Sequence, residues 1–81
     1  MTRQNPDIID FYNRQIIPQI EEKYGYTFMQ AVNEFVNSKT HKMLEDEEYG
    51  LAGFASGAVF DMWECEKVTG RPQNSIYIRG E

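Results

Sequence analysis

Apolar residues recur at helical spacing in the first part of the chain. Residues three to four apart share one face of an α-helix, so this spacing predicts an amphipathic helix from Asn5-Pro6-Asp7 to Gly25. The apolar positions are Ile9, Tyr12, Ile16, Ile20 and Tyr24, widened by Ile8, Phe11 and Ile17. Pro18 lacks the backbone donor and crowds the carbonyl of Arg14, so we expect a kink or a break over residues 15–18.

Two further helices and a glycine-rich segment follow. Thr27 and Gln30 match a capping box, which predicts that a second helix begins there. This helix ends at Asn37-Ser38, where a short helix over residues 39–48 begins. The apolar face of the second helix consists of Phe28, Met29, Val32, Phe35 and Val36. Three glycines close together then predict a loop or a tight packing point: Gly50, Gly53 and Gly57.

A last helix is predicted over about residues 57–69. Ser56 is a favourable N-cap for it, and Gly70 and Pro72 are the residues that commonly follow a helix end. Its wide apolar face consists of Val59, Phe60, Met62 and Trp63.

Together these elements predict an all-α fold, a compact three- to four-helix domain with a short extended C-terminal tail over residues 71–81. The alternation around Ile76-Tyr77-Ile78 allows the tail to be a short strand or an arm that packs back. A chain of 81 residues has the length of one domain, residues 1–81. The expected core is Ile9, Ile16, Ile20, Val32, Phe35, Met43, Leu44, Val59, Phe60 and Trp63.

Acidic residues gather in one part of the sequence. The net charge is −5, yet residues 1–42 hold five acids and five bases, and residues 67–81 hold three bases and one acid. Residues 43–66 have seven acids and no base: Glu45, Asp46, Glu47, Glu48, Asp61, Glu64 and Glu66. Neutralising phosphates requires clustered Lys and Arg, so we expect no direct binding to nucleic acid or to an anionic membrane.

No motif in the sequence predicts an active site. His41 and Cys65 are each the only residue of their type, whereas metal sites need several such ligands at suitable spacing. Ser56 stands one place late for the nucleophile elbow G-x-S-x-G and is better interpreted as a helix cap. We therefore expect a protein that is not an enzyme, with no metal and no cofactor.

The sequence also bears on the compartment. A single cysteine excludes an intramolecular disulfide and suits a reducing environment. No apolar run approaches the roughly 18 residues that cross a bilayer. The first residues, 1–6, lack the apolar centre of a secretory signal peptide. We therefore expect a cytoplasmic protein.

A pattern of helix caps, acids and aromatic residues runs from Ser38 to Glu66. It consists of Ser38, Leu44, Asp46-Glu47, the glycine turn Gly50-Leu51, Ser56, Val59-Phe60-Asp61-Met62-Trp63 and Glu66. In this pattern the chain resembles a family of small uncharacterised bacterial proteins, some of which are encoded beside ADP-ribosyltransferase-like toxins. The resemblance implies a non-enzymatic, partner-binding role, antitoxin-like in character, and it implies no catalytic residue.

Three functions stay open at this level. The first is a protein-binding module that neutralises or inhibits a basic partner protein through an acidic face. The second is a phage-encoded inhibitor that mimics nucleic acid and blocks a host defence or nucleic-acid-binding protein. The third is a structural homo-oligomer, with a homodimer as one form, held through Ile76-Tyr77-Ile78 as an added strand or arm.

The expected partner-binding residues are Glu45, Asp46, Glu47, Glu48, Tyr49, Asp61 and Glu64. Tyrosines at the ends of elements are further interface candidates, because they combine apolar area with a polar tip: Tyr24, Tyr26, Tyr49 and Tyr77.

Overall fold

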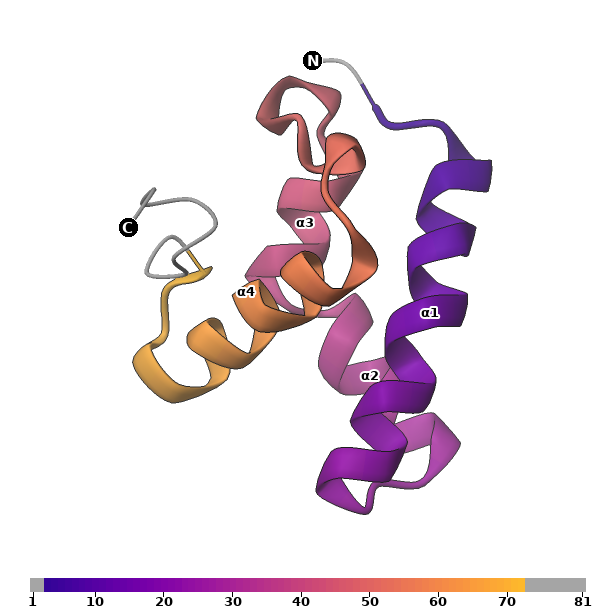
Figure 1. The fold of residues 1–81 in the computed structure, drawn as a ribbon, viewed down its shortest axis with the longest axis vertical. Coiled ribbons are helices and arrows are strands. Elements are labelled where there is room, and N and C mark those ends of the chain that lie inside the picture. Colours follow the sequence, from indigo (N-terminus) through magenta and orange to yellow (C-terminus); the bar gives the residue numbers. More distant parts are fainter. Residues whose placement is uncertain (1–2, 73–81) are drawn as a thin grey trace.

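The structure, a computed structural model, describes residues 3–72 (Figure 1). These residues form α-helices and two short 3₁₀ turns, and within this range no strand is present. The elements are α1 (Pro6–Tyr24), α2 (Phe28–Val36), α3 (Lys39–Glu45), η1 (Glu47–Tyr49), η2 (Leu51–Gly53) and α4 (Ser56–Thr69). The all-α prediction is confirmed. The tail over residues 73–81, with the predicted segment Ile76-Tyr77-Ile78, lies outside the described residues.

The longest helix, α1, runs along one side of the molecule (Figure 1). It packs against α2 and α4, and α3 packs against α2 and α4 in turn. The arrangement is flattened, with principal extents of 32 × 29 × 19 Å over the described residues. Buried apolar side chains from all four helices form one central core.

Local signals set most of the helix ends. Gly25 and Gly70 end α1 and α4 in the left-handed conformation, with φ of 68° and 82°. Thr27 forms the predicted capping box at α2, and Ser38 accepts a hydrogen bond from the backbone of His41 at the start of α3. These four predictions are confirmed.

The predicted role of Ser56 as an N-cap is wrong. The helix α4 begins one residue earlier, with Ala55 at the N-cap position and no side-chain cap. The reason is in the backbone: the carbonyl of Ala55 already accepts hydrogen bonds from the amides of Ala58 and Val59, at 3.0 and 3.2 Å. Ser56 therefore lies inside the first turn.

Pro18 does not break α1, which is continuous from Pro6 to Tyr24. Proline removes one helical hydrogen bond, but the buried side chains on this helix lie on both sides of Pro18 and hold the two halves against the same core. These side chains are Tyr12, Ile16, Ile17 and Ile20. Of the two predicted outcomes over residues 15–18, the break is therefore wrong, and the kink stays a prediction.

The third helix is shorter than predicted. It ends at Glu45 rather than at residue 48, because Asp46 is extended, with φ −96° and ψ 109°. The Asp46 side chain accepts a hydrogen bond from the amide of Glu48 at 3.0 Å and so begins the turn η1. A short acidic side chain that bonds to nearby backbone competes with helix continuation.

Most of the predicted core is buried. Ile16, Ile20, Phe35, Met43, Leu44, Val59 and Trp63 are confirmed, whereas Ile9, Val32 and Phe60 are only partly buried. Further buried residues complete the interior: Tyr12, Ile17, Ala31, Thr40, His41, Leu51 and Met62.

Candidate functional site

Five of the predicted partner-binding residues are consecutive, from the last residue of α3 to the end of η1, and we call this segment, Glu45–Tyr49, the acidic turn. It lies beside the segment that leads into α1 (Figure 1). The amide of Gln4 donates to the carbonyl of Glu45 at 2.6 Å, and Arg3 forms an antiparallel bridge with Asp46. The start of the chain therefore fixes one side of the acidic turn.

Two residues of the acidic turn have partners within the protein. The Glu45 carboxylate lies 3.5 Å from the guanidinium of Arg3 and 3.0 Å from Nδ1 of His41. Asp46 caps η1 through its side chain. These two acids hold the turn in place, and neither presents an unpaired carboxylate.

The other three residues of the turn point into solvent. Glu47, Glu48 and Tyr49 are exposed, the tyrosine by 57%. Within residues 3–72 their side chains have no hydrogen bond or ion pair. Gly50 closes the turn in the left-handed conformation, with φ 71°, and its amide donates to the carbonyl of Glu47 at 3.1 Å. The structure thus presents two carboxylates and one aromatic ring on a fixed backbone.

The two remaining predicted residues, Asp61 and Glu64, lie half-buried on α4. Glu64 accepts hydrogen bonds from Lys23 at 2.6 Å and from the Tyr24 hydroxyl at 2.7 Å. Burial alone would raise the pKa of Glu64, but the hydrogen bonds from Lys23 and Tyr24 outweigh it and lower that pKa. Burial and the bond to Glu64 raise the pKa of Tyr24 to about 12.

The acidic turn and Glu64 do not share a surface patch. The acidic turn contacts the segment before the first turn of α1, whereas Glu64 contacts Lys23 in its last turn. A helix of 19 residues is about 28 Å long. Charge patterning along the chain could not show this separation, because it depends on how the helices pack.

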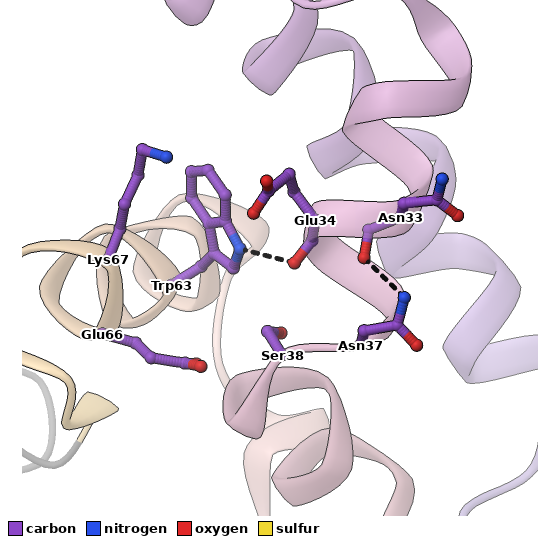
Figure 2. A pocket seen from close by; sticks show the side chains of 7 residues that line it. All are labelled: Asn33, Glu34, Asn37, Ser38, Trp63, Glu66 and Lys67. Carbon is purple, nitrogen blue, oxygen red and sulfur yellow. Dashed lines mark hydrogen bonds between the residues drawn. The ribbon is translucent and has the colours of Figure 1, made fainter.

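A cleft of about 390 Å³ lies between the end of α2 and α4 (Figure 2). Figure 2 shows the Trp63 ring in it, flanked by the side chains of Glu34 and Lys67. The indole Nε1 donates to the carbonyl of Glu34 at 3.2 Å, and the Asn37 amide donates to the carbonyl of Asn33 at 3.0 Å. Most polar groups that line the cleft are therefore already bonded within the protein.

Glu66, also at this cleft, caps a different helix. Its carboxylate accepts hydrogen bonds of 2.8 Å from the amides of Lys39 and Thr40 and from the Thr40 hydroxyl. A carboxylate is favourable at a helix N-terminus, where amides have no helical partner. The sequence did not indicate this role, because Thr40 and Lys39 lie 26 and 27 residues before Glu66 in the chain.

Two predicted interface tyrosines are engaged in an internal aromatic cluster. The Lys67 ammonium lies 5.2, 5.3 and 5.6 Å from the ring centres of Tyr24, Tyr26 and Trp63. It also donates to the Tyr26 hydroxyl at 2.8 Å, and this hydrogen bond raises the pKa of Lys67. The cluster joins α4 to the end of α1, which leaves Tyr49 as the exposed candidate; Tyr77 lies outside the described residues.

His41 is a buried structural residue. Its Nδ1 lies 3.0 Å from Glu45 and its Nε2 3.1 Å from the side-chain oxygen of Asn13. Both ring nitrogens are therefore occupied: Nε2 links α3 to α1, whereas Nδ1 bonds within α3. The ring packs edge-on against Phe35. Over residues 3–72, moreover, no group of three or more His, Cys, Asp or Glu side chains could hold a metal ion.

Comparisons with protein-family models, with curated proteins and with solved structures found nothing that matches the chain. In the part of the chain that the structure describes, no helix combines the length and apolar character needed to cross a bilayer. Function is therefore inferred from the geometry of the described residues.

Proposed function

We propose that this protein is a non-enzymatic, cytoplasmic protein-binding module that neutralises or inhibits a basic partner protein through the acidic turn. One observation carries the proposal: Glu47, Glu48 and Tyr49 are exposed and unpaired within the described residues, on a turn that is fixed at both ends. The antitoxin-like character comes from the resemblance of the stretch from Ser38 to Glu66.

The rigidity of the acidic turn favours binding. Asp46 caps it at the start, and Gly50 closes it in a left-handed conformation. The Tyr12 hydroxyl lies within hydrogen-bond distance of the carbonyls of Leu51 and Ala52, at 3.1 Å each, and also bonds to that of Phe54. A surface held in this way loses little conformational entropy on binding.

The three exposed side chains are suited to complementary tasks. Carboxylates at Glu47 and Glu48 attract a basic surface and increase the rate of encounter. Tyr49 offers apolar area with a polar tip, and tyrosine is enriched among residues that dominate binding energy. We therefore assign contact to these three, and positioning to Glu45 and Asp46.

The nucleic-acid mimic has less support than the protein-binding module. A mimic needs a continuous row of free acids at the spacing of phosphates. Glu45 and Glu64 are paired with bases instead, and these two acids lie at opposite ends of α1. An isolated acidic turn with an aromatic ring fits a protein surface better.

The proposal is tested by capture from a lysate of cells that make the protein, with tagged full-length chains. Three baits are compared. The first is the native chain, and the second, the turn variant, carries Glu47→Lys with Glu48→Lys. The third carries Glu21→Lys with Glu22→Lys. The third bait is the matched control, because it changes the net charge equally, near the end of α1, where lysine is favourable. Retained proteins are identified by mass spectrometry at low and at high salt.

We expect a basic protein that the native chain and the control retain in near-equal amount and that the turn variant loses. High salt should weaken its retention, since screening acts on exposed charges. Equal retention by all three baits, or retention of nothing by the native chain, contradicts the proposal.

A further inference from the structure

A second exposed surface is an apolar groove between α1 and α2, which shares no residue with the acidic turn. Its volume is about 450 Å³. Phe28 and Val36 are 59% and 37% exposed, and the neighbouring Met29 is 62% exposed. The apolar side chains that line the groove are Ile17, Pro18, Phe28, Val32 and Val36.

The apolar side chains of α2 form a regular ridge. Phe28, Val32 and Val36 are four residues apart, so they follow one row along the helix surface. Ridges of this kind pack into the grooves beside the same row on another helix. Each copy of the chain therefore presents both a ridge and the groove beside it, as a two-fold contact requires.

The charges around the groove are also self-complementary. Asp10 and Arg14 are the only charged residues that line it, and they pair with each other at 2.9 Å. The single charged residue of α2, Glu34, lies instead at the cleft with Trp63 (Figure 2). In a chain with a net charge of −5, this face is thus neutral.

We propose that this face binds a second copy of the chain, with α2 and its groove packed against the same surface of the partner copy. In a two-fold contact Asp10 of one copy faces Arg14 of the other, and the converse pair forms at the same time. The groove contains no residue of the acidic turn, so a dimer presents two such turns. The residues assigned to this contact all lie on α1 and α2.

Sedimentation velocity of the full chain in reducing buffer, over a range of concentrations, tests this inference. The expected species at high concentration has twice the mass of 9.5 kDa. Phe28→Glu should raise the dissociation constant about tenfold or more, because the contact would bury an unpaired carboxylate. An acid at Phe28, in the first turn of α2, favours the helix, so the variant should keep its helical circular dichroism.

Two controls separate this contact from general stickiness. Val68 on α4 is 82% exposed and lies outside the groove, so Val68→Glu should leave the association unchanged. Asp10→Arg and Arg14→Asp should each weaken the dimer by placing like charges opposite each other, and the double variant should restore it. Native chain that is monomeric at every concentration, or a dimer that Phe28→Glu leaves intact, overturns the inference.

Discussion

At the scale of single residues, carboxylates join elements that are distant in sequence. Glu66, on α4, accepts hydrogen bonds from the first turn of α3, and Glu64 links α4 to the last turn of α1. Charge-assisted hydrogen bonds are roughly twice as strong as neutral ones, so these two side chains contribute to the stability of the packing. In this protein much of the acidic composition therefore serves the fold, and only part of it is free for a partner.

Replacing Glu66 should destabilise the protein. Glu66→Ala removes the carboxylate that accepts three hydrogen bonds, two of them from backbone amides at the start of α3. We therefore expect the free energy of unfolding to fall by about 1–3 kcal/mol. Urea unfolding, followed by the fluorescence of Trp63, the single tryptophan, measures it. Glu22→Ala, an exposed change on α1, is the control and should have little effect; equal loss in both variants contradicts the assignment.

Glu64 should make stability depend on acid. Its pKa is lowered in the folded protein from the usual 4.5, so its contribution is fully present above that value. The contribution is lost as the pH falls through the lower pKa of the folded state. Glu64→Gln should therefore be less stable at neutral pH, and the difference from the native chain should shrink on acidification. Urea unfolding at a series of pH values measures this; a constant difference down to low pH would refute it.

At the scale of elements, the acidic turn depends on one glycine. Gly50 has φ 71°, a conformation that L-residues rarely adopt, whereas a Cβ at Gly50 or at Gly53 would meet no atom within 4 Å. The conformation alone, rather than space, therefore requires glycine at position 50.

Gly50→Ala should consequently cost about 1–2 kcal/mol of the free energy of unfolding, because alanine is strained in the left-handed region. Gly53→Ala, at an ordinary φ in the same loop, is the matched control and should be close to neutral. Urea unfolding compares the two variants. A Gly50→Ala variant as stable as the control would mean that the turn adopts another conformation.

The helices themselves were largely predictable because their signals are local. A capping box at Thr27, an N-cap at Ser38 and left-handed glycines at Gly25 and Gly70 act within a few residues of the helix end. The continuity of α1 through Pro18 was not predictable in this way, because it depends on the contacts that both halves of the helix make with the core. The early end of α3 at Asp46 depends on a competing side-chain bond.

At the scale of the whole molecule, packing divides the surface into three regions. The acidic turn lies at one end of α1, the aromatic cluster around Lys67 joins the other end to α4, and the apolar groove lies between α1 and α2. The acids of the candidate site were identified from the sequence. The sequence did not show which of these acids are paired and which are exposed, because the pairing depends on where Arg3, Lys23 and His41 lie in space.

The most direct test of the central claim, that the acidic turn contacts a partner, is photo-crosslinking in cells that make the protein. A photoreactive phenylalanine derivative is placed at Tyr49 in one chain and at Val68 in another, since both side chains are exposed. The account predicts a crosslinked product at Tyr49 that contains a different, basic protein, and none at Val68. The same product at both positions, or no heterologous product at Tyr49, would contradict it.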